Sequence, residues 1–173
     1  MDAPAFDDNG WRIGAVDPLA SGCAFTLLSA EARGAFDRSK LAARAAAHGL
    51  EVELRPEKRY PAGTTPIADA ADVSVAPRGA AARQSVLVVT FPAERARWLI
   101  DEALEVAARR GGAGMDALVR RARRIWQVRV TDDAKSALGV AAVLSAAHLA
   151  AILPPDAGPV FGPKTAFERL LAL

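Results

Sequence analysis

The sequence has few of the residues that build disulfide frameworks, metal sites and catalytic pairs. It contains one cysteine, two histidines and one tyrosine among 173 residues. One cysteine excludes a disulfide scaffold. His48 and His148 stand alone, with no H-E-x-x-H or C-x-x-C motif to supply metal-ligand spacing. We therefore expect no metal, no cofactor and no catalytic residue set.

An excess of charge of one sign is also missing. The net charge is +2, from 22 basic and 20 acidic residues, which does not by itself indicate a nucleic-acid partner. A hydrophobic fraction of 51% with 24% charged residues is typical of a soluble globular protein. The first residues, MDAPAFDDNG, carry no basic region followed by an apolar one. Together with the lone cysteine, this predicts a cytoplasmic protein.

One apolar run, 137–153, approaches the length of a membrane span. It has 17 residues without an acid, lysine or arginine, which is the lower limit for crossing about 30 Å of hydrocarbon. Many of them are alanine, and no basic cluster flanks the run. We expect a buried helix that ends at Pro154, and no membrane contact.

The order of the expected elements indicates an α+β fold. Residues 50–55 alternate apolar and charged, which predicts a strand, and Ser85–Phe91 reads as a central strand. Asp37 and Gly49 are suited to begin and end the helix between residues 23–29 and 50–54. Neighbouring strands without helices between them favour antiparallel pairing. We expect an irregular lead-in over 1–22 and one domain over 23–173, with a mostly antiparallel sheet and helices on one face; two ferredoxin-like halves joined near residue 80 are the alternative.

Two stretches resemble a group of uncharacterised bacterial α+β domains of unknown function. The first joins the strand 25–29, the helix 36–48 and the strand 50–54. The second joins the strand 126–130, the alanine-rich helix and the segment 158–162. The resemblance implies an α+β fold and brings no activity or catalytic residue with it.

Arginine is concentrated in one part of the chain. Residues 109–129 hold seven arginines and a single acid, Asp116. A helix capped by Asp116 would turn Leu118 and Ala122 inward and four arginines outward. These four are the candidate binding residues: Arg120, Arg121, Arg123 and Arg124. Arginine grips carboxylates and phosphates alike, and the alternative is a solvated face paired to Asp101, Glu102 or Glu105.

Three other features have ordinary structural explanations. Cys23 with His48 or His148 supplies the residue types of a thiol site, but a cysteine in an apolar strand is usually buried and inert. Residues 112–117 match the G-x-G-x-x-A spelling of a dinucleotide motif, but a helix, not a strand, precedes them. The loop 56–66 has turn residues and offers a second surface for a partner.

These observations favour a non-enzymatic interaction domain that binds an acidic protein surface through the arginine-rich helix. A small enzyme with a Cys/His site and a nucleic-acid backbone binder are the alternatives.

Overall fold

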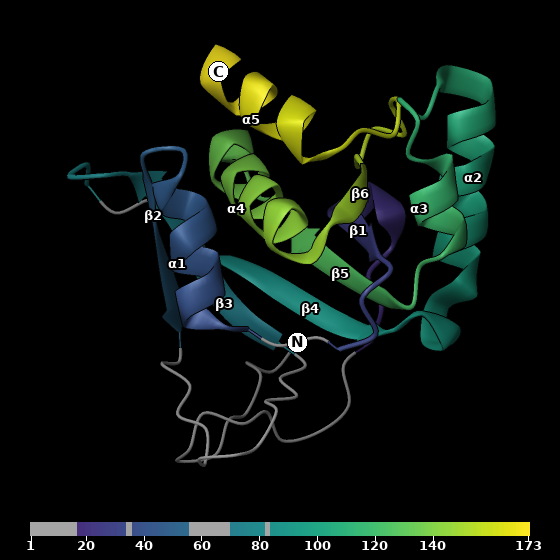
Figure 1. Ribbon diagram of the computed structural model, residues 1–173, viewed down its shortest axis with the longest axis horizontal. Coiled ribbons are helices and arrows are strands. Elements are labelled where there is room, and N and C mark those ends of the chain that lie inside the picture. Colours follow the sequence, from purple (N-terminus) through teal and green to yellow (C-terminus); the bar gives the residue numbers. More distant parts are fainter. Residues whose placement is uncertain (1–16, 34–35, 56–69, 82–83) are drawn as a thin grey trace.

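A computed structural model of the chain describes residues 17–33, 36–55, 70–81 and 84–173 (Figure 1). The strands are β1 (Ala24–Ser29), β2 (Leu50–Arg55), β3 (Ala70–Pro77), β4 (Val86–Pro92), β5 (Arg124–Arg129) and β6 (Ala150–Leu153). The α-helices are α1 (Arg38–Ala46), α2 (Arg97–Arg110), α3 (Asp116–Arg120), α4 (Ala134–His148) and α5 (Pro163–Ala172). Two short 3₁₀ helices, η1 (Ser21–Cys23) and η2 (Ala93–Ala96), precede β1 and α2.

The six strands form one antiparallel sheet in the order β2-β3-β4-β5-β1-β6. The α+β class and the antiparallel sheet are thus confirmed. Strands from both sides of residue 80 share this sheet, because β4 pairs with β3 on one side and β5 on the other. The alternative of two separate ferredoxin-like halves is therefore wrong, because one continuous sheet contains all six strands.

Helices cover both faces of the sheet, whereas the sequence predicted one covered face. Strand residues alternate between the two faces, and each face has its own buried cluster. Leu27, Val88 and Val128 pack with α1, α4 and α5. Leu28, Val89 and Ile125 pack with α2 and α3. Figure 1 shows α4 lying across one face of the sheet, with α2 and α3 on the other side of the sheet. The central strands are therefore buried on both faces, which explains their continuous apolar sequences.

Local signals placed several elements correctly. Asp37 is the N-cap of α1, where its side chain accepts a hydrogen bond from the Lys40 amide at 3.1 Å. Gly49 follows this helix with φ +69°, a backbone conformation that glycine adopts without strain. Asp133 caps α4 through the amides of Lys135 and Ser136.

Two elements differ from the expectation. The alanine-rich helix ends at His148 instead of Pro154, and Ala150–Leu153 form an edge strand paired with β1. Helix α3 ends at Arg120, so β5 begins with Arg124. Within the described ranges, none of the helices is both long and apolar enough to cross a bilayer. The loop 56–66 lies outside the described residues.

Candidate functional site

Three of the four candidate arginines lie on the surface at the end of α3. Arg120 is the last residue of the helix, Arg121 is its C-cap, and Arg123 lies in the turn before β5. All three are exposed. Within the part of the chain that the structure describes, none of them forms an ion pair. Their guanidinium groups are therefore available to a ligand.

Arg124 was wrongly expected on this surface. It is only 7% exposed and is the first residue of β5, on the sheet face that α4 covers. Its Nε donates to the carbonyl oxygen of Ala32 at 2.9 Å, and its Nη1 donates to Thr90 Oγ1 at 3.3 Å. The strand period of two turns Arg124 to the same face as Trp126. Arg124 therefore belongs to the interior of the protein, where its charge is held by hydrogen bonds.

Two further arginines extend the exposed surface from a distant part of the sequence. The amide of Ala93 donates to the carbonyl oxygen of Arg123 at 3.0 Å, which holds η2 beside the turn after α3. This contact brings Arg95 and Arg97 near the end of α3, and both are exposed. Trp98, the next residue, is 48% exposed. Sequence reasoning missed this extension because Arg97 lies 23 residues or more before Arg120, Arg121 and Arg123 in the sequence.

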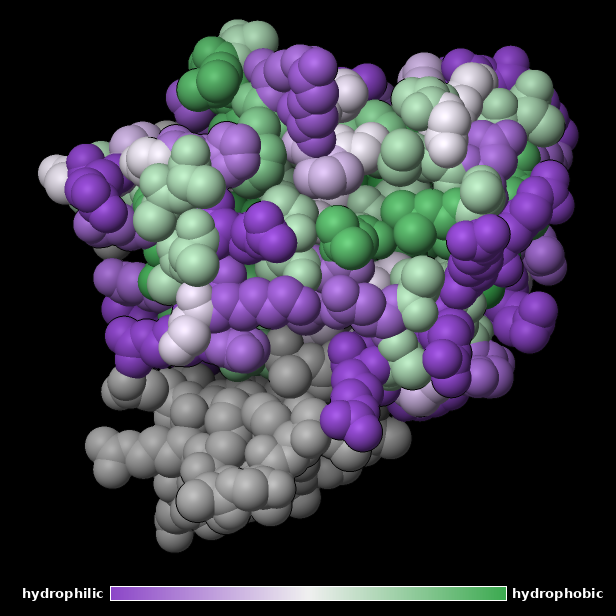
Figure 2. Space-filling view, in the orientation of Figure 1, coloured by the Kyte–Doolittle hydropathy of each residue, from purple (hydrophilic) through white to green (hydrophobic). Residues whose placement is uncertain are grey.

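We call these five residues the arginine surface: Arg95, Arg97, Arg120, Arg121 and Arg123. Hydrophilic side chains, interspersed with apolar ones, cover the outer side of α2 in this view (Figure 2). Four exposed acids lie on the same elements as these arginines: Glu94, Asp101, Glu105 and Asp116. Glu105 pairs with Arg109, and within the described residues none of the four forms an ion pair with the arginine surface. The surface is therefore basic with interspersed carboxylates.

The cysteine and the two histidines do not converge. Cys23 precedes β1, whereas Ser29, at the other end of that strand, donates to the carbonyl oxygen of His148. Six residues of extended strand span about 20 Å. Cys23 is exposed, which corrects its expected burial. His48 follows α1 and stacks on Phe167 with ring centroids 3.6 Å apart. The geometry therefore provides no thiol–imidazole pair.

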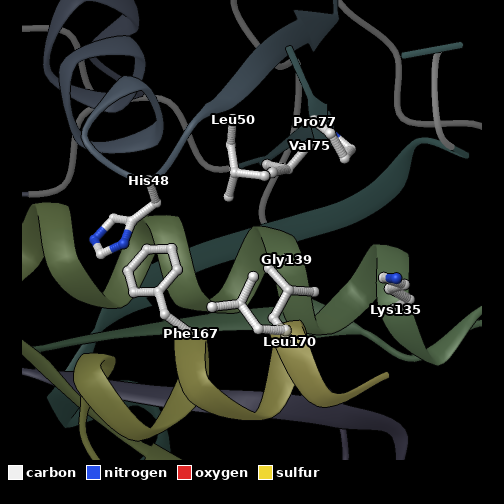
Figure 3. Close-up of a pocket in the computed structure, with 9 residues that line it drawn as sticks. His48, Leu50, Val75, Pro77, Lys135, Gly139, Phe167 and Leu170 are labelled. Atoms are coloured by element: carbon white, nitrogen blue, oxygen red, sulfur yellow. The ribbon is translucent and has the colours of Figure 1, made fainter. Parts of the chain in front are cut away.

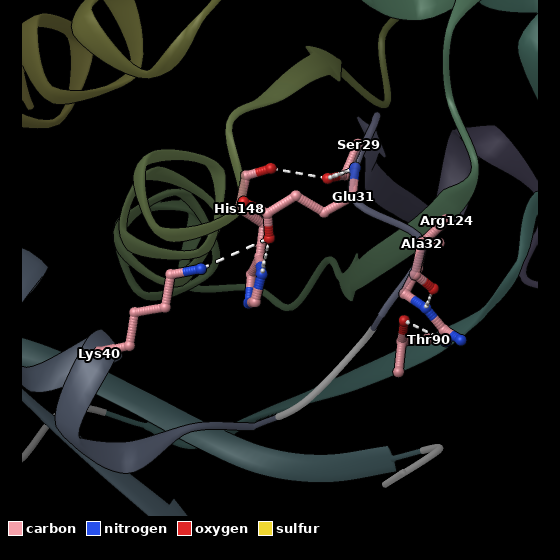
Figure 4. A network of polar contacts seen from close by, with 7 residues as sticks. All are labelled: Ser29, Glu31, Ala32, Lys40, Thr90, Arg124 and His148. Carbon is pink, nitrogen blue, oxygen red and sulfur yellow. Dashed lines mark hydrogen bonds and ion pairs between the residues drawn. The ribbon is translucent and has the colours of Figure 1, made fainter. Parts of the chain in front are cut away.

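His148, the last residue of α4, belongs to a small polar network at the C-terminal end of this helix (Figure 4). Its Nδ1 lies 3.4 Å from Glu31 Oε2, and the same carboxylate oxygen lies 3.4 Å from Lys40 Nζ. The imidazole is 3% exposed. Burial lowers the pKa of His148 below its ordinary value, and the nearby Lys40 charge lowers it further, while Glu31 opposes both effects. The ring is therefore neutral at pH 7, with Nδ1–H donating to Glu31.

Among the described residues, two buried ring nitrogens in this region have no hydrogen-bond partner, Nε2 of His148 and Nε1 of Trp126. The two rings stack with centroids 4.4 Å apart. Phe36 meets the Trp126 ring edge-on at 5.1 Å. An imidazole oriented by a carboxylate has the arrangement of a general base, but His148 Nε2 is buried and its ring stacks on Trp126. In this conformation the network orders the end of α4 and does not present a base to substrate.

The glycine-rich residues 111–115 connect α2 to α3. They follow α2 rather than a strand, as the sequence indicated. The Asp116 carboxylate folds over Gly112, where a dinucleotide site would need room for phosphate. Within the described ranges no group of three His, Cys, Asp or Glu side chains lies close enough to hold a metal ion.

Comparisons of the chain with family models, with curated proteins and with solved structures find no match. The class of the protein is therefore defined by its fold, a six-stranded antiparallel α+β sheet covered on both faces, and by its own surface chemistry.

Proposed function

We propose that the protein is a non-enzymatic interaction domain whose arginine surface binds an acidic protein partner. The observation that carries this proposal is the gathering of five exposed arginines, from two separated segments, with no ion pair to any of them within the described residues. A guanidinium group binds a carboxylate through two parallel hydrogen bonds. Such a surface gains most from a partner that brings several carboxylates.

The composition of the surface favours a protein over a phosphate backbone. Glu94 and Asp101 are exposed among the arginines, and they would repel a continuous row of phosphates. The same two acids are available to basic groups at the edge of a protein partner. Trp98 is the exposed aromatic residue on these elements, and tryptophan and arginine are the residue types enriched at the energetic centres of protein interfaces. A cytoplasmic location, where Cys23 would stay reduced, agrees with this role.

Charge reversal tests the surface directly. We expect the triple variant Arg120→Glu, Arg121→Glu and Arg123→Glu to bind a fluorescent glutamate-rich peptide at least about tenfold more weakly than the natural sequence, because three contacts of about 0.5–1 kcal/mol each are lost. The matched control reverses three exposed arginines outside the surface, Arg44, Arg55 and Arg78. It changes the net charge by the same amount and should retain the affinity within about twofold.

The same anisotropy titration is run with a single-stranded oligonucleotide of equal charge over a range of salt concentrations. Weaker binding of the oligonucleotide than of the peptide supports a protein partner. Tighter binding of the oligonucleotide with a steep salt dependence would replace the proposal with phosphate recognition. An equal loss in the control variant would show that net charge, and not the arginine surface, sets the affinity.

A further inference from the structure

A small cavity lies on the face of the sheet opposite the arginine surface (Figure 3). Its volume is about 160 Å³, and it is lined by residues of α4, α5, β2, β3 and the turn between α1 and β2. Leu50, Val75, Phe167 and Leu170 provide its apolar walls. A cavity of about 150 Å³ with apolar walls accommodates one benzene ring. The space therefore fits a ligand with a single-ring or branched aliphatic body.

Gly139 of α4 keeps this space open. A Cβ at this position would lie 3.6 Å from the nearest Val75 carbons and 3.8 Å from Leu170 Cδ1, which are ordinary contacts. An alanine would thus fit without displacing a neighbour, and it would favour the helix by up to about 1 kcal/mol. A longer side chain would project into the cavity. The packing of α4 therefore does not require a glycine at position 139, but the missing side chain leaves space in the cavity beside the helix.

The polar side chains among the described residues of the lining are Lys135 and His48. None of these described lining residues is an aspartate or a glutamate. The Lys135 ammonium forms no ion pair within the described part of the chain. His48 is held in place by its stack on Phe167, with an angle of 12° between the rings. In Figure 3 His48 and Lys135 lie toward opposite ends, with the apolar side chains between them.

We propose that this cavity binds a small monocarboxylate whose body is one aromatic ring. The ring would occupy the apolar space beside Gly139, and the carboxylate would accept hydrogen bonds from the Lys135 ammonium. The apolar walls contribute through burial of the ring. An ammonium with no ion pair and no carboxylate beside it among the described residues selects an anion over a neutral ligand of equal shape. This site is independent of the arginine surface, so either proposal can fail without the other.

Three probes separate the two parts of the proposed recognition. Phenylacetate carries the ring and the charge, phenylacetamide carries the ring alone, and acetate carries the charge alone. Binding is followed through the imidazole NMR signals, because the chain has only two histidines. His48 lines the cavity and His148 does not, so His148 is an internal reference. We expect phenylacetate to shift the His48 signal and to bind at least about fivefold more tightly than phenylacetamide.

Two variants assign the site. Lys135→Met keeps the aliphatic stem and removes the charge, and should weaken phenylacetate binding by about fivefold without affecting phenylacetamide. Its control is Lys164→Met, at an exposed position of α5 outside the cavity. Gly139→Leu should abolish binding of both aromatic probes. If that variant does not fold, the Lys135→Met comparison still decides.

Equal affinity for phenylacetate and phenylacetamide would overturn the proposal. Unchanged affinity of Lys135→Met for phenylacetate would also overturn it. So would a His48 signal that does not shift at a phenylacetate concentration of about 10 mM, which is tenfold above the Kd of a weak, millimolar ligand.

Discussion

Lowering the pH below neutrality should destabilise the protein through His148. The imidazole is almost fully buried, and this burial holds its pKa below the ordinary value of 6.5. Between the folded and the ordinary pKa, the unfolded chain binds a proton that the folded chain does not. Protonation of His148 therefore does not reduce the free energy of unfolding above pH 6.5. Below pH 6.5 the free energy of unfolding falls as the pH drops toward the pKa of the folded state. For one group the slope is at most about 1.4 kcal/mol per pH unit.

Replacement of His148 by phenylalanine isolates this contribution. Phenylalanine preserves an aromatic ring against Trp126, where the natural rings stack at 4.4 Å, and it cannot be protonated. Glu31 loses the imidazole but keeps Lys40 Nζ at 3.4 Å and remains partly exposed to water. Urea unfolding between pH 7 and pH 5, followed by tryptophan fluorescence, should show a smaller loss of stability in the variant. Burial raises the pKa of Asp72, but this effect is common to both proteins and cancels in the comparison.

His48→Phe is the matched control, because it removes the other imidazole at an exposed position. This variant should retain the pH dependence that His148 causes. An identical pH dependence in the natural protein and His148→Phe would refute the reasoning, since it would mean that the buried ring is not the group whose protonation opposes folding.

Three substitutions test other parts of the fold by urea unfolding at pH 7. Arg124→Met should lower the free energy of unfolding by about 2 kcal/mol, since it removes charged donors from Thr90 and Ala32; a loss below about 0.5 kcal/mol would contradict the buried role. Asp133→Ala should cost about 1 kcal/mol by removing the cap of α4, and unchanged stability would contradict that role. Gly139→Ala should raise stability by up to about 1 kcal/mol, and a loss would show that the cavity does not admit a Cβ.

Elements with strong local signals were predictable from the sequence. β2 alternates apolar and charged residues because one of its faces packs against the helices and the other meets solvent. Helix α1 is bounded by an aspartate that accepts an amide hydrogen bond and by a glycine with positive φ. In both cases the residues that decide the structure are neighbours in the chain, so that a short stretch of sequence is sufficient.

The end of α4 was not predictable in this way. The sequence remains apolar and rich in alanine through Leu153, which suits a buried helix and a buried strand equally. Leu149 adopts φ +48° and ends the helix, although leucine gives no local sign of this conformation. Ala150–Leu153 then pair with β1, more than 100 residues earlier in the sequence. The deciding interaction is a distant strand edge that a local pattern does not contain.

The same kind of long-range interaction separates Arg124 from the other three candidate binding arginines. Four arginines in five positions indicate an exposed helix face, but antiparallel pairing of Arg124 with Ser29 and Pro92 places it in a strand. Its side chain is then turned inward, while Arg123 stays exposed and a backbone contact adds Arg95 and Arg97 nearby. This division determines which charge reversal is informative. A variant that includes Arg124→Glu would bury a carboxylate in place of a hydrogen-bonded guanidinium, and it would lose binding through unfolding whether or not the surface binds a partner.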